Sequence, residues 1–387
     1  MRNGDASVVS GLFGVPGQVE VERGLAEFRG GRPVRITTPE KAVIALPVDG
    51  IDARRLAAFA AFTAPALPLL VITARRARAL GLDAADPVAI ALSAADDPES
   101  IASLVADADV RRVVEAKPAS LGAKAAIDLA KFAQRLPALL VADAGAVNGA
   151  YVDPPLVSVE AESIARFRRS VLKSLTIAGD AHVPLHGGLS TRFVVFRDGT
   201  GGGSVAVIVG KPDFAKPVPV RLHSACLTGD VFGSRRCDCG DQLKLALARL
   251  NESGGGVILY LEQEGRGVGL ANKMRAYQLQ DKGLDTVDAN TTLGFDDDER
   301  DYSIAARMLE MLGCTRVRLL TNNPAKVDSL AGAGIEVSGR LPLYTPINAH
   351  NRRYLTAKAT RAGHRLEHLV TALSEATALP EAGKAKT

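Results

Sequence analysis

Cysteine is scarce in this chain, which has only four among its 387 residues. A scaffold built on disulfides is therefore excluded, and a chain of this length can bury a large core without such cross-links. The first 170 residues contain neither cysteine nor histidine and no dense acidic cluster, so they offer few groups for catalysis or metal binding. They are expected to form a structural or regulatory domain.

An excess of charge of one sign is also missing, because 47 Lys and Arg stand beside 43 Asp and Glu. The net charge of +4 permits anionic ligands such as phosphates but gives no general signature of nucleic-acid binding. With 47% hydrophobic and 23% charged residues, the composition is that of a folded protein rather than a disordered one.

Long hydrophobic runs are limited to one stretch, residues 56–74, with 19 uncharged residues between two pairs of arginines. Pro65 and Pro68 interrupt it, and a helix through Phe62 followed by a strand at 67–73 explains it without a membrane span. The opening residues, MRNGDASVV, lack the basic and then apolar pattern of a signal peptide. A cytoplasmic location is therefore expected.

The length of the chain predicts two domains, at about 150 residues per domain. In the first, residues 1–170, Val21, Leu25 and Phe28 recur on one face of a helix predicted at 19–28. Short apolar strands are predicted at 42–46, 67–73 and 138–141, and a helix at 123–135. This alternation indicates a layered α/β or α+β domain.

The second domain is expected at 171–375, followed by a flexible tail at 376–387. Its first two strands, 193–196 and 205–209, flank a Gly-rich loop that is typical of a hairpin. Further strands are predicted at 218–222, 256–261 and 317–320, and helices at 241–250 and at 300–312, the last burying Ile304, Met308 and Leu312. All cysteines and histidines fall in this half, so the chemistry is expected there.

Three of the cysteines, Cys226, Cys237 and Cys239, fall within 14 positions. Thiolates grouped in this way are soft ligands suited to zinc. Three protein ligands plus a water would make a hydrolytic zinc site, whereas a fourth ligand, His223 or Cys314, would make a closed structural site. Buried free thiols are the third alternative.

Two polar segments directly follow predicted strands. Residues 263–269, QEGRGVG, combine glycines that let backbone N–H groups approach a phosphate with Arg266 for a bidentate contact and Glu264 for Mg²⁺. Residues 321–326, TNNPAK, place polar groups at the carboxyl end of a strand, where ligands commonly bind. Each segment is also compatible with an ordinary turn.

An acidic run at 296–301, DDDERD, is expected to open the helix predicted at 300–312. Acidic side chains cap helix N-termini and complement the helix dipole. Because one aspartate suffices as a cap, Asp298 and Arg300 could instead face a site.

Four segments resemble GTP cyclohydrolase II, in the order that this family has them. They are RLHSACLTGDVFGSRRCDCGDQL at 221–243, QEGRGVGLANKMRAYQLQDKGLDTVDAN at 263–290, LGFDDDER at 293–300 and RLLTNNPAK at 318–326. The resemblance covers about residues 172–370 and implies an α+β protein whose second domain is a mixed α/β catalytic domain.

This resemblance implies the first step of riboflavin biosynthesis. In that reaction GTP is hydrolysed to 2,5-diamino-6-(5-phosphoribosylamino)pyrimidin-4(3H)-one, formate and pyrophosphate. The family uses one zinc ion per subunit for the purine ring and Mg²⁺ for the triphosphate, and it is usually homodimeric. No nucleic-acid or membrane partner is implied.

The resemblance also assigns residues. Cys226, Cys237 and Cys239 would hold zinc, Tyr277 would lie near the ring chemistry, and Asp298 and Arg300 match a proton acceptor and a nucleophile in pyrophosphate release. Because a guanidinium must lose a proton before it attacks, a cationic clamp on the α-phosphate is the rival role for Arg300. The positions that match GTP contacts are Arg221, Leu222, His223, Ser224, Ala225, Gln242, Glu264, Gly265, Arg266, Thr286, Thr321 and Lys326.

One position departs from the family pattern, because Ala225 stands where a glutamate is often found. The change removes a carboxylate next to the first cysteine. Two other interpretations stay open, the first of them because of Ala225 and the unusual N-terminal half. The chain could be a related enzyme of another route, such as uracil catabolism, or a nucleotide-binding regulator without turnover.

The first domain resembles 3,4-dihydroxy-2-butanone-4-phosphate synthase more faintly, in VERGLAEFRGGRPV at 21–34 and in residues 67–80. The acidic Mg²⁺-binding run expected after the first strand is replaced by TTPEKA at 37–42. Ribulose-phosphate chemistry needs clustered carboxylates, Mg²⁺ and general bases. The resemblance therefore implies a degenerate, non-catalytic domain retained for packing or dimerisation.

Overall fold

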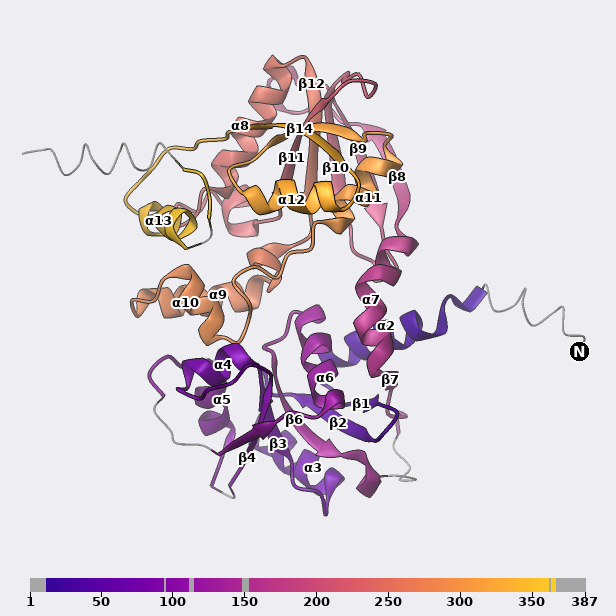
Figure 1. Ribbon diagram of the computed structural model, residues 1–387, viewed down its shortest axis with the longest axis vertical. Coiled ribbons are helices and arrows are strands. Elements are labelled where there is room, and N and C mark those ends of the chain that lie inside the picture. The colour runs from indigo at the N-terminus through magenta and orange to yellow at the C-terminus, as the bar shows by residue number, and fades with distance from the viewer. Residues whose placement is uncertain (1–11, 94, 111–114, 148–152, 362, 367–387) are drawn as a thin grey trace, which may run out of the picture. The chain divides into compact units, whose positions relative to one another are not determined.

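The computed structural model describes residues 12–93, 95–110, 115–147, 153–361 and 363–366, so the tail predicted at 376–387 lies outside the described residues. The contacts divide the chain into two compact units (Figure 1). The first comprises Met1–Leu175, Asp198–Gly201 and Glu264–Arg300, and the second Thr176–Arg197, Gly202–Gln263 and Asp301–Thr387. Each unit is mixed α/β, and the expected α+β fold of two domains is confirmed.

The first unit is built on a seven-stranded sheet of order β5-β4-β3-β6-β2-β1-β7, in which only β1 and β7 pair in parallel. Its strands are β1 (Val34–Thr37), β2 (Ala42–Pro47), β3 (Leu69–Ile72), β4 (Val88–Ala91), β5 (Ala116–Pro118), β6 (Ala138–Asp143) and β7 (Ser158–Glu160). Its helices are α2 (Pro16–Arg29), α3 (Ala53–Thr63), α4 (Ala74–Ala79), α5 (Pro98–Ala106), α6 (Leu121–Phe132), η1 (Ala144–Val147), α7 (Ala161–Ser174), η4 (Glu264–Gly267), α9 (Leu270–Asp281) and α10 (Thr286–Thr292).

Both faces of this sheet are buried, because successive side chains of a strand point to opposite faces. Val43 and Ala45 of β2 pack with helices α2, α6 and α7, whereas Ile44 and Leu46 face the helices of the other side. The predicted helix at 19–28 is confirmed, with Val21, Leu25 and Phe28 buried. The predicted strands at 42–46, 67–73 and 138–141 are confirmed as β2, β3 and β6.

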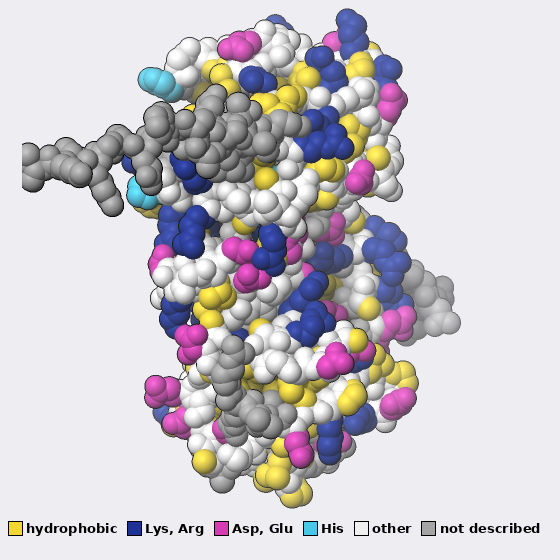
Figure 2. All heavy atoms as spheres, turned by 60° about the vertical axis from the view of Figure 1, so that its left-hand side comes forward, with side chains coloured by type: hydrophobic (Ala, Val, Ile, Leu, Met, Phe, Trp, Pro, Cys, Tyr) yellow, Lys and Arg dark blue, Asp and Glu magenta, His cyan; other side chains and the backbone are white. Residues whose placement is uncertain are grey.

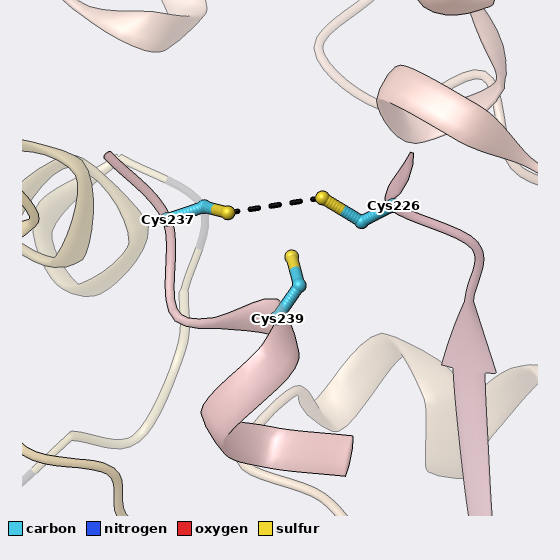
Figure 3. A group of neighbouring side chains, drawn as sticks. All are labelled: Cys226, Cys237 and Cys239. Carbon is cyan, nitrogen blue, oxygen red and sulfur yellow. Dashed lines mark hydrogen bonds between the residues drawn. The ribbon is translucent and has the colours of Figure 1, made fainter. Parts of the chain in front are cut away.

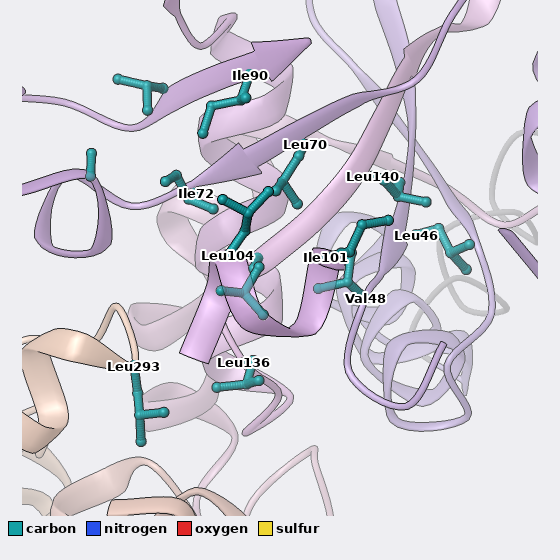
Figure 4. Close-up of a cluster of buried hydrophobic side chains, with 14 of the residues drawn as sticks. Leu46, Val48, Leu70, Ile72, Ile90, Ile101, Leu104, Leu136, Leu140 and Leu293 are labelled. Carbon is teal, nitrogen blue, oxygen red and sulfur yellow. The ribbon is translucent and has the colours of Figure 1, made fainter. Parts of the chain in front are cut away.

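The second face of the sheet is covered in part by helices from a distant part of the chain. Ala276 and Leu279 of α9, Ala289 of α10, and Leu293 and Phe295 beyond it belong to one core with Leu70, Ile72, Ile101, Leu104 and Leu136 (Figure 4). Arg76, only 2% exposed, strengthens this packing by donating to the carbonyls of Thr292, Leu104 and Ser103. Residues 264–300 therefore fold as part of the first unit.

The apolar stretch at 56–74 forms the end of helix α3 and strand β3, as the two prolines predict. Among the described residues, no helix has the length and apolarity needed to cross a membrane.

The second unit has its own seven-stranded sheet, of order β14-β13-β11-β12-β10-β9-β8. The four strands from β14 to β12 run parallel, and the remaining pairs are antiparallel. Its strands are β8 (Thr176–His182), β9 (Thr191–Arg197), β10 (Val205–Gly210), β11 (Val218–Ser224), β12 (Gly255–Leu261), β13 (Arg316–Leu320) and β14 (Glu336–Leu341). Its helices are η2 (His186–Gly188), η3 (Leu227–Val231), α8 (Cys239–Glu252), α11 (Ser303–Met311), α12 (Pro324–Gly332) and α13 (Arg352–Thr360).

Most predicted elements of this unit are confirmed, including the hairpin in which Val195 of β9 pairs with Val205 of β10. The prediction for helix 300–312 is wrong at its start and in its buried face. The helix begins at Ser303, whose N–H donates to the Asp301 carboxylate, and it buries Ala305, Ala306, Met308 and Leu309. Ile304 and Leu312 are only partly buried. Alanines at 305 and 306 allow close packing of this face, which the spacing of the larger residues did not indicate.

Candidate active site

The chemistry-bearing segments of the second unit gather at one edge of its sheet. Strands β12, β11 and β13 are adjacent and parallel, so their carboxyl ends meet at the same edge. The first cysteine follows β11 and Thr321 follows β13. The fold thereby brings together motifs that are about a hundred residues apart in the sequence.

The three cysteines form a compact thiol cluster (Figure 3). Cys226 follows β11, Cys237 lies in the loop before α8, and Cys239 is the first residue of that helix. Their sulfur atoms all lie within 4.8 Å of one another, with 3.7 Å between Cys226 and Cys237. In the described part of the chain, this is the one group of three or more Cys, His, Asp or Glu that could hold a metal ion, and neither His223 nor Cys314 belongs to it.

The protonation state of these thiols depends on whether a metal ion lies between them. The pKa of Cys237 is raised to about 11, because it hydrogen-bonds with Cys226 and is buried, and the pKa of Cys239 is raised for the same reasons. Three thiolates this close together would repel one another unless a cation lay between them. A bound divalent metal reverses this balance and takes thiols as thiolates.

Gly229 in the turn η3 makes the cluster possible. A Cβ at this position would lie 2.9 Å from the sulfur of Cys237 and 3.0 Å from that of Cys226. Real contacts of this kind are essentially absent from folded proteins, because overpacking forces neighbouring atoms apart.

Replacement of Gly229 by alanine is therefore expected to spread the sulfur atoms and to lower the metal content per chain, measured by elemental analysis. Gly203→Ala is the matched control, because its Cβ would have nothing within 4 Å. An unchanged metal content in Gly229→Ala would show that the cluster tolerates the added methyl group.

Asp230 organises the groups behind the first cysteine. Its carboxylate, 3% exposed, accepts from the Cys226 backbone N–H at 2.9 Å and from the Tyr260 hydroxyl at 2.9 Å. His223 Nε2 lies 3.1 Å from both of its oxygens. Burial lowers the pKa of His223 despite this carboxylate, so the imidazole is neutral at pH 7.

Asp238, between the second and third cysteines, is held by hydrogen bonds from two helices, α8 and α13. It is 2% exposed and accepts from Gln242 Nε2 at 2.6 Å and from Lys358 Nζ of helix α13 at 2.7 Å. Burial alone would raise the pKa of Asp238, but the ammonium group of Lys358 lowers it below its usual range. Arg221 continues this chain of contacts by donating to the Gln242 side-chain oxygen.

Arg221 and Lys326 connect the neighbouring strands β11 and β13. Arg221 donates to the Leu320 carbonyl at 3.0 Å, and Lys326 donates to the Leu222 carbonyl at 2.8 Å. Thr321, 1% exposed, accepts from the Asn323 N–H at 3.0 Å and so shapes the turn that carries Lys326. The Leu222 side chain is fully buried in the sheet, while Ser224 and Ala225 are partly exposed.

The remaining predicted residues belong to the first unit. In the turn η4, Arg266 has a φ of +63°, which is rare for a residue with a side chain and is often found at functional sites. Its guanidinium group donates to the Asp297 carboxylate at 2.8 Å. Glu264 accepts from Lys273 at 2.8 Å and from the Gly265 N–H at 2.8 Å, which orients its carboxylate.

Asp298 and Arg300 form a bidentate pair, with Nε at 2.7 Å from Oδ1 and Nη2 at 2.5 Å from Oδ2. Partial burial would raise the pKa of Asp298, but the hydrogen bonds from Arg300 lower it below its usual range. Tyr277 on α9 is partly exposed and has the Lys273 ammonium 5.9 Å from its ring centre. Thr286 is the first residue of α10.

The acidic run opens the helix only through its last member, Asp301, because residues 296–300 form an irregular loop. Most of its acidic side chains have cationic partners instead. Asp296 pairs with Arg75 and Lys131, Asp297 with Arg266, and Glu299 with Lys131.

Sequence reasoning missed three groups of this site, namely Asp230, the pair of Asp238 with Lys358, and Lys131. Asp230 and Asp238 both lie in the cysteine motif, and an acidic residue four positions after a ligand was a usable signal. Nothing in the sequence near Lys358 or Lys131 indicates their partners, which are 120 and 165 or more residues away.

Comparison with known proteins agrees with these motifs. A family model described as GTP cyclohydrolase II matches residues 176–342. The GTP cyclohydrolase-2 of Azospirillum brasilense is 43% identical over 359 residues, which are 89% of this chain and 93% of that protein. The GTP cyclohydrolase-2 of Azotobacter vinelandii is 51% identical over 196 residues, 51% of this chain but 94% of that protein.

Two further comparisons give a match over a smaller share of the chain and a distant structural likeness. The riboflavin biosynthesis protein RibBA of Bacillus mycoides is 55% identical over 162 residues, which are 42% of this chain and 41% of that protein. The solved structure of RibBX, a two-domain 3,4-dihydroxy-2-butanone 4-phosphate synthase from A. baumannii, covers 84% of this chain and 99% of its own. The TM-score is 0.32 and the sequence identity is 14%.

The two-domain fold, the thiol cluster and these relatives define a hydrolase of riboflavin biosynthesis. The chain belongs to the GTP cyclohydrolase II family and is an enzyme with that activity.

Proposed function

We propose that the thiol cluster holds the zinc ion with which this enzyme opens the purine ring of GTP. The observation that carries the proposal is a cluster of three sulfur atoms and no fourth ligand among the described residues. Such a site keeps a coordination position open, whereas a structural zinc site is closed by four protein ligands. Zinc bound there would supply a Lewis acid and lower the pKa of a coordinated water to about 7.

The protein groups around the cluster have supporting roles in this proposal. Asp230 fixes the backbone of Cys226, and Asp238 fixes the segment that carries Cys237 and Cys239. Contacts of this kind orient metal ligands and tune their basicity. Arg221, His223, Ser224, Ala225, Gln242, Thr321 and Lys326 are proposed to bind the nucleotide, with Leu222 contributing through its backbone.

The first-unit residues are proposed to serve the triphosphate and the ring. Glu264 would bind Mg²⁺, Gly265 and Arg266 would contact phosphate oxygens, and Thr286 would contact GTP. Tyr277 would act near the ring chemistry. The strained backbone at Arg266 supports this reading, since such conformations cluster at ligand sites.

For Arg300 we propose a clamp rather than a nucleophile. A guanidinium has a pKa above about 12, and its partner Asp298 has a lowered pKa, so proton transfer between them is strongly unfavourable. A bidentate cation held by a carboxylate is instead suited to stabilising charge on the α-phosphate as pyrophosphate leaves.

The experiment that tests the proposal follows formate, pyrophosphate and the absorbance of the opened pyrimidine during incubation with GTP and Mg²⁺. The reaction is run with and without a zinc chelator. Formation of both products, with formate release stopped by chelation and restored by zinc, is the expected result. Formate release that survives complete removal of the metal would refute the zinc site.

Ala225 stands where the family often has a carboxylate beside the first cysteine. Parallel assays with a guanine nucleotide and a pyrimidine nucleotide test whether this change alters the choice of substrate. Turnover of GTP and none of the pyrimidine nucleotide is the expected result.

For the first domain we propose a degenerate synthase-like fold without catalysis. The residues that replace the acidic run form a tight hairpin turn between β1 and β2, closed by the Thr38 N–H on the Lys41 carbonyl at 3.0 Å. The Azotobacter vinelandii relative, of about half this length, supports the view that cyclohydrolase activity does not require synthase chemistry. Butanone-phosphate formation from ribulose 5-phosphate by this protein would contradict the proposal.

We also propose a cytoplasmic homodimer without nucleic-acid or membrane partners. Basic and acidic side chains are interspersed over the face drawn in Figure 2, which supports the absence of a nucleic-acid surface there.

A further inference from the structure

The loop that carries Asp298 and Arg300 is bound by a cation from the N-terminal half of the chain. Lys131 on helix α6 places its Nζ 2.7 Å from Glu299 Oε1 and 3.0 Å from Asp296 Oδ2. Glu299 lies between Asp298 and Arg300 in the sequence. A contact that holds Glu299 in place therefore also restricts the backbone positions of these two neighbours.

This ion pair is well shielded from water. The Lys131 side chain is 16% exposed and that of Glu299 is 10% exposed. Burial alone would lower the pKa of Lys131, but Glu299 and Asp296 raise it above its usual range, so the lysine is firmly charged. The neighbouring pair of Arg75 with Asp296 is about half exposed on both sides and is expected to contribute little.

Glu299 also connects the loop to the phosphate-binding turn proposed at 264–267. Its N–H donates to the Arg266 carbonyl at 3.1 Å, and its carboxylate accepts from the Asp296 N–H at 2.9 Å. A Cβ at Gly267 would lie 3.0 Å from the carbonyl carbon and oxygen of Glu299, so the two backbones are in close contact. Lys131 thus pairs with the side chain of the residue whose backbone contacts the turn at 264–267.

We infer that Lys131 is a positioning residue for pyrophosphate release. The first domain, proposed to have no catalysis of its own, supplies through Lys131 the charge that keeps Glu299, and with it Asp298 and Arg300, in place. The inference depends on the roles proposed for Asp298 and Arg300. Removal of the ammonium group leaves the Glu299 carboxylate, 10% exposed, without its cation, and the loop must rearrange to expose that carboxylate to water.

Lys131→Met in the full chain tests the inference, since methionine keeps most of the length and apolar packing of lysine. The expected result is a fall of about tenfold to a hundredfold in kcat for pyrophosphate release, the range expected when a reacting group is misplaced by about 1 Å. The zinc content should not change. Lys131→Arg, which keeps the charge, should recover most of the loss, and Glu299→Gln should lower kcat in the same direction.

Lys124→Met is the matched control, because Lys124 lies two turns earlier on α6 and, within the described ranges, pairs with the exposed Asp86 and with no residue of the 296–300 loop. Thermal unfolding of each variant separates a loss of fold from a loss of position. Turnover by folded Lys131→Met within twofold of Lys124→Met would overturn the inference, as would equal losses in Lys131→Met and Lys131→Arg.

Arg300→Ala, assayed alongside, distinguishes a failure of the inference from a failure of the proposed function. If Arg300→Ala is inactive and Lys131→Met is fully active, the inference alone is wrong. If Arg300→Ala releases pyrophosphate at the parent rate, the role proposed for Arg300 is wrong and the inference falls with it.

Discussion

Replacement of Cys239 by serine is expected to end formate release while the chain stays folded. Cys239 opens helix α8 and supplies one of three sulfur atoms within 4.8 Å of one another. A serine hydroxyl is a much poorer zinc ligand than a thiolate, and two remaining sulfur atoms do not hold a tight site. Zinc per chain and formate produced from GTP, measured on the same preparation, are both expected to fall close to background.

Cys314→Ala provides the matched control for this experiment. Cys314 is fully buried, outside the thiol cluster, and burial raises its pKa to about 11, so it is an inert thiol. This variant is expected to retain zinc and formate release, at some cost in stability from the small cavity. Equal zinc contents in Cys239→Ser and the parent would exclude the cluster as the metal site.

Replacement of Arg300 by alanine is expected to abolish pyrophosphate release. The guanidinium group is held by two hydrogen bonds to Asp298, and loss of a preorganised cation at a developing phosphate charge costs several orders of magnitude in rate, about 10³ to 10⁵ for comparable arginines. Pyrophosphate released from GTP, followed with a coupled assay, is the measurement.

Two further substitutions decide what Arg300 does. Arg300→Lys keeps a positive charge, so as a clamp it should retain more turnover than Arg300→Ala, and intact mass of the parent during turnover should show no covalent nucleotide. A phosphorus–nitrogen adduct on Arg300 would instead establish it as a nucleophile. Arg307→Ala, which removes only an exposed pair with Glu310, should leave the rate unchanged.

Local patterns in the sequence predict much of this molecule. Alternating apolar residues are enough for the hairpin of β9 and β10, and the spacing of Cys226, Cys237 and Cys239 predicts a cluster that the structure confirms. The start of α11 was mispredicted, because acidic residues that could cap a helix are instead paired with cations from elsewhere in the chain.

Contacts between distant segments could not be predicted from the same patterns. The apolar pattern of α9 and α10 does not indicate which of the two sheets these helices pack against. Only the fold shows that their core partners include Leu70 and Ile72. The ion pairs of Lys131 with Glu299 and of Lys358 with Asp238 were unpredictable for the same reason. The sequence around a lysine on a helix does not indicate which distant carboxylate it will contact.

The core shared by α9, α10 and the N-terminal sheet has a consequence for evolution and engineering. The stretch that carries the family signature, residues 176–342, is divided between the two compact units of this chain, because Leu279, Leu293 and Phe295 within it belong to the core of the first unit. A fragment excised at that boundary would expose these side chains to water as a hydrophobic patch that favours aggregation. Transfer of the signature region into a shorter relative would therefore require substitution of the apolar residues on this face of α9 and α10 by polar ones.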